Sequence, residues 1–318
     1  MILITGAAGF IAARLAQHLH LNTSSDLLLV DDFIARPDKQ VSWAWSLDNP
    51  RVTRLQRQDL WTALPNYSIE AVFHLGARTD TTLFDKAIFD DLNIGYSKRL
   101  WTYCAEQQIP FYYASSAATY GNGEKGYDDY TLPAELRPLN PYGDSKNDFD
   151  AWVLTQVTTP PNWAGFKFFN VYGYGESHKG RMASVVWHAY NSIKQKGSMQ
   201  LFKSHRPDFA DGAQSRDFVS VTDVVNILTW FYSNRPQSSI YNLGTGQARP
   251  FLDLTRAVFA ALQIPENISF IDTPLDIRDT YQYFTEARLH KLRSVGYTAN
   301  FLSLEQGVLE YVSLLQSH

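Results

Sequence analysis

The chain begins with a short apolar segment that leads directly into a glycine-rich turn. Ile2–Thr5 has the composition of a buried strand, Gly6 and Gly9 follow it, and an amphipathic stretch over Ile11–His20 predicts a helix. In such a turn the first glycine permits a tight bend, and the second lets the backbone approach a pyrophosphate at the helix N-terminus. The third position of the motif is Ala12, which is small enough for the helix to pack on the sheet. The segment therefore predicts a dinucleotide site; the alternative is a turn with a structural role only.

The rest of the chain repeats this alternation of apolar runs and helix-length segments. Further strands are predicted over Leu27–Val30, Ala71–Leu75, Phe111–Ser115 and Gly165–Asn170, and further helices over Asn93–Gln108 and Pro141–Gln156. Strands and helices that alternate at this spacing, with right-handed crossovers, predict an α/β fold with a doubly wound parallel (Rossmann) sheet. Two later apolar runs, Phe218–Val221 and Ile240–Leu243, are candidates to return to the same sheet.

Composition divides the chain into two discontinuous parts. Residues 171–216 are rich in glycine, cationic and aromatic residues, and residues 246–318 carry further helix-like segments. We therefore predict a dinucleotide-binding Rossmann domain of residues 1–170 plus 217–245, and a smaller substrate-binding domain of residues 171–216 plus 246–318. The stretch Lys203–Arg216 is polar and long for a plain connection, which indicates a functional or a mobile loop.

Charge and cysteine content argue against several classes of protein. With 28 Lys and Arg against 32 Asp and Glu, the formal net charge is −4, which argues against a general nucleic-acid binder. Cys104 is the only cysteine, so neither an intramolecular disulfide nor a cysteine-rich zinc module is expected, and we predict no metal site. The N-terminus has no signal-peptide pattern and no apolar run reaches about 18 residues, so we expect a cytoplasmic protein without a membrane partner.

Charged residues after the second strand bear on which dinucleotide is bound. Asp31 and Asp32 lie at the end of this strand, where an acidic residue usually bonds the ribose 2′-hydroxyl and favours NAD. Arg36 and Lys39 follow closely, and cations there could neutralise a 2′-phosphate and favour NADP. A solvated loop of mixed charge is the alternative. Asp59–Leu60, after the third strand region, is a candidate to flank the adenine.

A Tyr-x-x-x-Lys pattern at Tyr142 and Lys146 supplies candidate acid–base chemistry. Residues four apart share one face of a helix, and a nearby ammonium favours the phenolate, which lowers the pKa of a tyrosine. Ser115–Ser116 ends a predicted strand, at the sheet edge where such folds bind ligands, so we expect hydroxyl groups near the Tyr142 oxygen. Serine, tyrosine and lysine together can remove a proton from a sugar hydroxyl while hydride leaves the carbon. A second match, Tyr190 and Lys194, lies after most of the predicted Rossmann strands and is interpreted as a coincidental helix-face pair.

The glycine turn, the serine pair and the Tyr142–Lys146 pattern resemble the extended short-chain dehydrogenase/reductase family. Later segments narrow the resemblance to the ADP-L-glycero-D-manno-heptose 6-epimerases, over nearly the whole chain. These segments are Phe168–Gly173, Ser177–Gly180 with Met182–Ser184, Arg216–Val219, Asn242–Gly246 and Tyr281–Thr285. The string from His178 to Ser184 is the most specific, because sugar epimerases that act at C4 do not generally share it.

The resemblance implies an isomerase that holds NADP tightly, with NAD as the alternative. Such enzymes oxidise C6 of ADP-D-glycero-D-manno-heptose to a ketone and return the hydride to the other face, supplying heptose for the lipopolysaccharide inner core. Tyr142 and Lys179 match the two catalytic residues, one for each C6 epimer. Lys146 matches the residue that bonds the nicotinamide ribose, and Ser116 completes the catalytic set. The resemblance also implies a homo-oligomer whose substrate partner is ADP-heptose.

The resemblance assigns further contacts by position. Besides Gly6, Gly9 and the catalytic Tyr142, Lys146 and Lys179, the positions that match cofactor contacts are Phe10, Ile11, Asp31, Asp32, Lys39, Leu75, Gly76, Ala77, Arg78, Thr79, Asn93 and Val171. Besides Ser116, the positions that match contacts to the ADP-sugar are Asn170, Arg181, His188, Phe202, Lys203, Ser204, His205, Arg216 and Tyr281. Three features depart from the family pattern: Leu75 replaces a common Glu, Arg181 replaces a common Ser, and the Lys203–Arg216 loop is longer. They bear on the sugar and nucleotide, and leave the hydride chemistry intact.

Two alternative functions differ in what they require of the site. A related nucleotide-sugar 4-epimerase or dehydratase would use the same fold, but a 4,6-dehydratase usually has acidic residues after a Thr at the end of the serine segment. Here Ala117–Tyr120 follows Ser116, which counts against that activity. A non-catalytic NADP-sensing protein would not need Tyr142, Lys146 and Lys179, so their presence argues against it.

Overall fold

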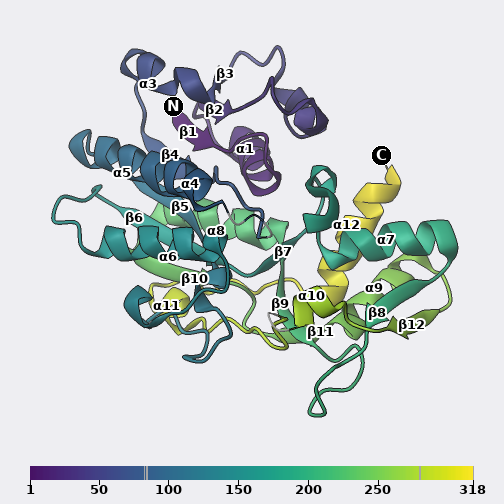
Figure 1. Ribbon diagram of the computed structural model, residues 1–318. Helices are drawn as coiled ribbons and strands as arrows, with labels where there is room; N and C mark the ends of the chain where they lie inside the picture. Colours follow the sequence, from purple (N-terminus) through teal and green to yellow (C-terminus); the bar gives the residue numbers. More distant parts are fainter. Residues whose placement is uncertain (82, 84, 279–280, 318) are drawn as a thin grey trace.

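The core of the fold is a parallel sheet of seven strands in the order β10-β6-β5-β4-β1-β2-β3. These strands are β1 (Ile2–Thr5), β2 (Leu27–Asp31), β3 (Val52–Gln56), β4 (Ala71–His74), β5 (Phe111–Ser116), β6 (Trp163–Phe168) and β10 (Ser239–Leu243). The computed structural model describes residues 1–81, 83, 85–278 and 281–317. All neighbouring pairs in the sheet are parallel (Figure 1). The strands from β1 to β3 are added toward one edge and those from β4 onward toward the other, so the strand order reverses between β1 and β4. The prediction of a doubly wound Rossmann sheet is therefore confirmed.

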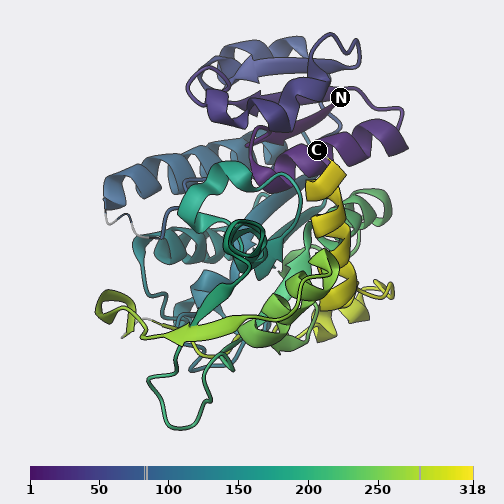
Figure 2. The same cartoon turned by 90° about the vertical axis from the view of Figure 1, so that its right-hand side faces the viewer.

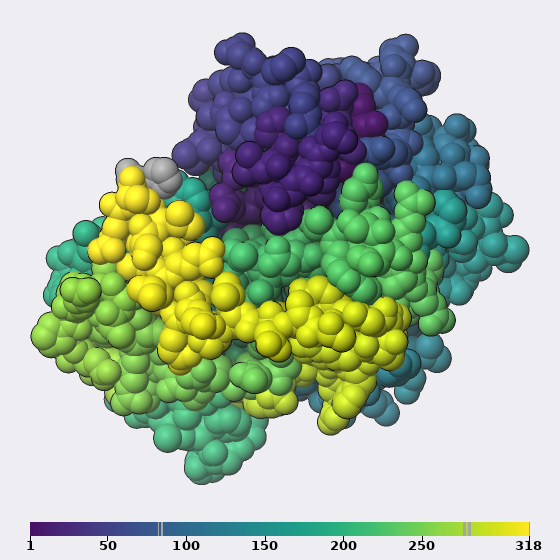
Figure 3. Space-filling view, turned by 180° about the vertical axis from the view of Figure 1, so that it is seen from behind, coloured from purple at the N-terminus to yellow at the C-terminus, as the bar shows by residue number. Residues whose placement is uncertain are grey.

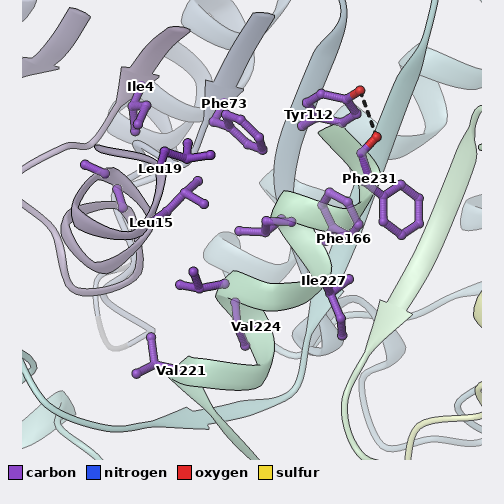
Figure 4. Packing of buried hydrophobic residues seen from close by; sticks show 14 of the residues in the cluster. Ile4, Leu15, Leu19, Phe73, Tyr112, Phe166, Val221, Val224, Ile227 and Phe231 are labelled. Atoms are coloured by element: carbon purple, nitrogen blue, oxygen red, sulfur yellow. Dashed lines mark hydrogen bonds between the residues drawn. The ribbon is translucent and has the colours of Figure 1, made fainter. Parts of the chain in front are cut away.

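Helices cover both faces of this sheet. On one face, α1 (Phe10–Asn22) and α8 (Val221–Asn234) pack with inward side chains of the strands in a single buried cluster. Figure 4 shows Leu15 of α1 and Ile227 of α8 within this cluster, and the Tyr112 hydroxyl donates to the Phe231 carbonyl at 3.2 Å. On the other face, α5 (Tyr96–Glu106) and α6 (Pro141–Leu154) form a second cluster. Since both faces are buried, most of the strands are continuous apolar runs, which is why the sequence pattern reveals them. The edge strand β3 is only partly buried and has no such run.

Short helices connect these elements. They are α2 (Gln40–Trp43), α3 (Leu60–Ala63), α4 (Lys86–Phe89) and α11 (His290–Ser294), with a π-helical segment over Asp90–Gly95 that leads into α5. The helix predicted over Asn93–Gln108 therefore begins in a wider turn than expected. Three-residue and longer 3-10 turns include Arg57–Asp59, Ala117–Tyr120 and Ser177–Met182.

A smaller part of the molecule lies beside the carboxyl ends of the large sheet's strands (Figures 1 and 2). One of its sheets has the order β11-β9-β7 and the other pairs β12 with β8. The strands are β7 (Asn170–Tyr172), β8 (Met199–Phe202), β9 (Ser215–Ser220), β11 (Ala248–Pro250) and β12 (Ile268–Ile271). The helices are α7 (Val185–Lys196), α9 (Phe251–Leu262), α10 (Leu275–Arg278) and α12 (Leu304–Ser317). Side chains of α7, α9 and α12 share a third buried cluster.

One of the two later strands does not return to the large sheet. Ile240–Leu243 lies in β10, at the edge beside β6, as expected. The expectation for Phe218–Val221 is wrong, because β9 pairs with β7 and β11 in the small sheet. An apolar run shows that a strand is buried but not which neighbour it meets, and here Phe218 packs in the third cluster. The division of the chain into two domains stays a prediction.

The rear of the molecule carries a surface cavity. There α1, α8 and α12 meet (purple, green and yellow in Figure 3), and the cavity of about 440 Å³ between them is lined by Arg14, His18, Thr222 and Glu310, among others. It faces the half of α1 that is remote from the glycine turn, so it is separate from the predicted site. None of the described helices is long and apolar enough to cross a membrane.

Candidate active site

The glycine turn between β1 and α1 leaves no room for a side chain. Gly6 has φ +69°, and a Cβ atom there would lie 2.5 Å from the Cα atom of Gly76, in the segment that follows β4. At Gly9 a Cβ atom would lie 2.9 Å from the Gly6 carbonyl oxygen. Gly9 is also the N-cap of α1 and has no side chain to cap the first amides. The turn and the uncapped first turn of α1 therefore form a cradle in which the first N–H groups of the helix fit the pyrophosphate of a dinucleotide.

A chain of buried hydrogen bonds fixes the segment that faces this turn. The Gly76 N–H donates to Thr5 Oγ1 at 3.3 Å, and Thr5 Oγ1 lies 2.7 Å from His74 Nδ1. His74 Nε2 lies 2.7 Å from the Ser97 hydroxyl, which donates in turn to the Asn93 carbonyl. Burial, with a smaller contribution from Lys146, lowers the pKa of His74 to about 3, so its ring is neutral and can donate through Nε2 while accepting at Nδ1.

Asn93 holds the strand-end segment from Leu75 to Thr79. Its side-chain oxygen accepts from the Arg78 N–H at 2.8 Å, and its amide nitrogen donates to the Arg78 carbonyl at 3.0 Å. The same nitrogen donates to the Ser145 hydroxyl of α6 at 2.9 Å. Asn93 lies in the π-helical segment and is buried, so its side chain organises the backbone at the site rather than facing solvent.

Both acidic residues at the end of β2 already bind other groups of the protein. Asp31 accepts from the Ala8 N–H of the glycine turn at 2.8 Å and from the Asp32 N–H at 2.7 Å. Asp32 pairs with Arg57 at 3.2 Å. Arg57 follows β3 and is half-exposed, and sequence reasoning did not find it.

The loop that follows Asp32 meets the turn that carries His178. Burial, together with the charges of Lys39 and Arg36, lowers the pKa of His178 to about 4. Arg36 itself pairs with Asp38 at 2.6 Å. Of the two residues predicted to flank the adenine, Asp59 is exposed. Leu60 is fully buried in the core, so its side chain is not available for that contact.

Ser116, Tyr142 and Lys146 come together at the carboxyl end of β5. Ser116 ends the strand, and its hydroxyl accepts from the Ala118 N–H at 3.1 Å. Tyr142 lies in the first turn of α6 and hydrogen-bonds Ser116. Lys146, one turn later, is buried and donates to the Ala114 carbonyl at 2.8 Å. The predicted acid–base set is therefore a contiguous cluster at the ligand-binding edge of the sheet.

Burial dominates the titration of both ionisable groups in this cluster. It raises the pKa of Tyr142, whereas the Ser116 hydrogen bond acts to lower this pKa. It lowers the pKa of Lys146 to about 8, and the nearby Asp150 acts to raise it. The Lys146 ammonium donates to the Ala114 carbonyl, and its effect on the pKa of Tyr142 stays a prediction.

Lys179 lies on a separate turn that faces the start of α1. Its ammonium is 5.4 Å from the centre of the Phe10 ring and 4.0 Å from Glu176, which is fully buried. Glu176 accepts from the Gly173 N–H at 3.2 Å and from the Ser184 hydroxyl at 2.6 Å, so both ends of the turn are held by one carboxylate. Burial lowers the pKa of Lys179, and Glu176 acts to raise it. No hydrogen bond joins Lys179 to Tyr142 in the described part of the chain.

A cluster of aromatic and cationic side chains surrounds Arg216 of β9. The Arg216 guanidinium lies 5.5 Å from the ring centres of both Phe251 and Tyr281. The Tyr281 ring lies 6.2 Å from Phe202 and 6.4 Å from His205. The structure thus brings together four of the positions predicted to contact the sugar nucleotide.

The other predicted substrate contacts have different surroundings. In the loop after β8, Lys203 pairs with Asp272 at 3.2 Å and the Ser204 N–H donates to Asp211 at 2.8 Å. Arg181 is exposed, and its carbonyl lies 3.3 Å from the His188 ring nitrogen. Asn170 is exposed at the start of β7, beside the partly buried Val171. None of these contacts involves Arg216.

No group of three or more metal-ligating side chains capable of holding a metal ion occurs among the described residues.

Comparison with known proteins shows to which family the chain belongs. A sequence model of the NAD dependent epimerase/dehydratase family matches residues 2–244. The chain belongs to this family. The ADP-L-glycero-D-manno-heptose-6-epimerase of Fusobacterium nucleatum subsp. nucleatum is 45% identical over 98% of this chain and 97% of its own length. The protein of the same name from Nitratidesulfovibrio vulgaris strain Hildenborough is 41% identical over 98% and 97%.

Within the epimerase/dehydratase family, the chain groups with the ADP-L-glycero-D-manno-heptose-6-epimerases, as the motifs predicted. Solved structures agree in fold. That of the Helicobacter pylori ADP-L-glycero-D-manno-heptose-6-epimerase has a TM-score of 0.82 at 24% identity, covering 100% of this chain and 96% of that one. The UDP-glucuronic acid 4-epimerase of Bacillus cereus, in complex with UDP-glucuronic acid and NAD, has a TM-score of 0.80 at 21% identity, covering 99% of both chains. The family that matches the chain is described as NAD dependent, which supports a nicotinamide cofactor for this protein.

Several residues of this epimerase were not found from its sequence. Arg57 lies in a segment without a recognisable motif. Glu176 is an acidic residue among polar neighbours, so nothing marked it as buried. Lys167 and Asp150 form a buried ion pair at 3.0 Å. A signal for this pair was present, because Lys167 interrupts the apolar run of a central strand and a buried cation requires a partner.

Proposed function

We propose that the protein inverts C6 of ADP-D-glycero-D-manno-heptose by transient oxidation, with tightly bound NADP. The observation that carries this proposal is the contiguous Ser116–Tyr142–Lys146 cluster, at the sheet edge that also bears the glycine cradle. The full-length identity to named heptose epimerases supports the choice of sugar. We place the reaction in the cytoplasm, in the supply of heptose for the lipopolysaccharide inner core, and expect a homo-oligomer.

The side chains divide the proton transfers between them. The dinucleotide whose pyrophosphate the cradle would hold would supply a hydride acceptor and donor. Because burial raises the pKa of Tyr142, its hydroxyl is protonated in the resting site and suited to protonate a ketone oxygen at C6. For the oxidation of the C6 hydroxyl, Tyr142 must first lose its proton, and its phenolate, which the Ser116 hydrogen bond favours, then takes the proton of that hydroxyl. Lys179 does the same for the other epimer from its own turn.

The preference for NADP rests on the charges beside the acidic pair. Asp31 already accepts two backbone N–H groups, so it has less capacity left for a ribose hydroxyl. Asp32 is neutralised by Arg57, which is half-exposed and can turn toward a phosphate. Lys39 lies on the neighbouring loop. A 2′-phosphate would therefore meet cations at this edge, as a guanidinium fork suits phosphate.

Replacing Arg57 with alanine tests this preference. We expect the affinity for NADP to fall by about 10- to 150-fold, since a charge-assisted hydrogen bond contributes about 1.5–3 kcal/mol, while the affinity for NAD stays within about two-fold. Titration calorimetry on protein stripped of dinucleotide measures both. Arg54→Ala is the matched control, because Arg54 lies on the same strand region but packs over Trp43 at 5.1 Å. Equal losses for NADP and NAD in Arg57→Ala would contradict the proposal.

The cluster around Arg216 is proposed to hold the nucleotide. Its guanidinium suits a diphosphate, and the rings of Phe202 and Tyr281 offer surfaces for a base. Arg181 and the Lys203–Arg216 loop are proposed to set the preference for sugar and nucleotide.

A single incubation tests the proposed activity. Purified protein without added cofactor is mixed with ADP-D-glycero-D-manno-heptose, and the two C6 epimers are separated by chromatography. Formation of the L-glycero epimer is expected, which also requires that the cofactor remains bound through purification. If no conversion occurs with NADP supplied and the fold intact, the choice of sugar is wrong, and UDP-, GDP- and dTDP-sugars are the next substrates.

A further inference from the structure

Two opposite charges are buried directly behind the candidate active site. The Lys167 ammonium of β6 lies 3.0 Å from the Asp150 carboxylate of α6, and their side chains are 2% and 0% exposed. Asp150 also accepts from the Tyr113 hydroxyl at 2.9 Å and the Ser115 hydroxyl at 2.7 Å. Such pairs contribute little net stability, because desolvation of both ions offsets their attraction. Stability alone therefore does not account for this one.

One end of the pair is connected to Ser116 by hydrogen bonds. Lys167 donates to the Thr119 hydroxyl at 2.6 Å, and Thr119 donates to the Ser116 carbonyl at 2.8 Å. The ammonium also lies 4.9 Å from the centre of the Tyr120 ring, whose hydroxyl donates to Asn242 at 2.7 Å. Through these contacts Lys167 fixes the turn over Ala117–Tyr120, which follows Ser116.

The other end of the pair shares a helix face with Tyr142 and Lys146. Asp150 lies four residues after Lys146 in α6, and it favours the charged form of that lysine. Tyr142 lies on the same helix as this lysine, and the neutral His74 of β4 is within range of its charge. Tyr113 of β5 and Lys167 of β6 contact Asp150 itself. Asp150 is the carboxylate among these groups.

We propose that the Lys167–Asp150 ion pair is the positioning element of the active site, holding Ser116 against Tyr142 from one side and keeping Lys146 cationic from the other. This rests on the proposed function, which assigns the proton transfer to Tyr142. Neither residue of the pair is placed in contact with the reacting atoms. Lys167 acts through Thr119 and Ser116, and Asp150 acts through Lys146.

The variant Asp150→Asn tests the electrostatic half of the proposal. Without the carboxylate, Lys146 loses its proton at lower pH, so the alkaline limb of the rate profile moves to lower pH. At neutral pH we expect kcat to fall by about 10-fold or more, a smaller loss than the 10²- to 10⁴-fold range for removal of an acid–base group itself, with KM for the sugar nucleotide changed less than about two-fold. Because Asp150→Asn leaves Lys167 unpaired, the double variant Asp150→Asn with Lys167→Gln keeps the core neutral, and it is expected to shift the limb in the same direction.

The positioning half is tested at Lys167. Lys167→Met is expected to lower kcat with little change in KM, and Lys167→Arg, which restores the cation, is expected to recover most of the loss. Asp223→Asn is the matched control, because Asp223 of α8 is also a buried carboxylate and accepts from the Leu302 N–H at 3.0 Å, outside the site. It is expected to lower the midpoint of thermal unfolding without moving the alkaline limb.

The outcomes separate this proposal from the proposed function. If Tyr142→Phe is inactive while Asp150→Asn and the double variant keep the wild-type alkaline limb, the positioning proposal is overturned and the site assignment stands. If Tyr142→Phe retains full turnover, the site assignment itself is wrong. An equal shift of the limb in Asp223→Asn would show that loss of any buried carboxylate has this effect, and would also overturn the proposal.

Discussion

Replacing Tyr142 with phenylalanine is expected to reduce epimerisation by about 10²- to 10⁴-fold, the range for loss of a general acid–base group. The ring remains and only the hydroxyl that bonds Ser116 is removed, so the fold and the affinity for the sugar nucleotide should change little. Turnover is measured by chromatography of the two C6 epimers, and substrate affinity by titration calorimetry.

Tyr190→Phe is the matched control for this variant. Tyr190 has the same spacing to a lysine in α7, but its hydroxyl donates to the Leu315 carbonyl at 3.3 Å in the third buried cluster. It should keep normal turnover. A Tyr142→Phe enzyme with turnover near that of the wild type would remove Tyr142 from the reaction, and equal losses in both variants would point to a packing effect.

Replacing Lys179 with methionine is expected to cost about as much turnover, again about 10²- to 10⁴-fold, because the second acid–base group is lost. The two variants should differ in which epimer they oxidise. Each should still remove the proton from the epimer served by its remaining group, so the absorbance of the reduced nicotinamide ring should rise with one epimer and not with the other.

The Lys179 variant also has a matched control and a result that would contradict it. Lys194→Met, on the exposed face of α7, removes a lysine without touching the site and should leave turnover unchanged. If Lys179→Met and Tyr142→Phe both oxidise the same epimer, the division of the two groups between the epimers is wrong.

The parts of the site that could be predicted are those governed by local chemistry. Gly6 and Gly9 are recognisable because only a residue without Cβ fits beside Gly76. Tyr142 and Lys146 are recognisable because a helix repeats its face every four residues. Ser116 follows from the end of an apolar run. Each inference needed only the residues within one strand, turn or helix.

What escaped prediction depends on contacts between distant segments. The strand at residues 215–220 was placed in the wrong sheet because its partners β7 and β11 lie far from it in the chain. Arg57 gains its position only when β3 aligns beside β2. The raised pKa of Tyr142 depends on the depth at which α6 packs, which no spacing encodes.

The pairing of β7 with β9 has a mechanical consequence. The chain first leaves the large sheet through β7 and first returns to it through β9, and these two crossings are aligned in register from Asn170–Phe218 to Tyr172–Ser220. Two separate linkers would act as a free hinge, whereas two crossings joined by backbone hydrogen bonds resist shear and twist as a single ribbon. Because Arg216 lies on β9, this ribbon limits how far the aromatic cluster can move relative to the glycine cradle.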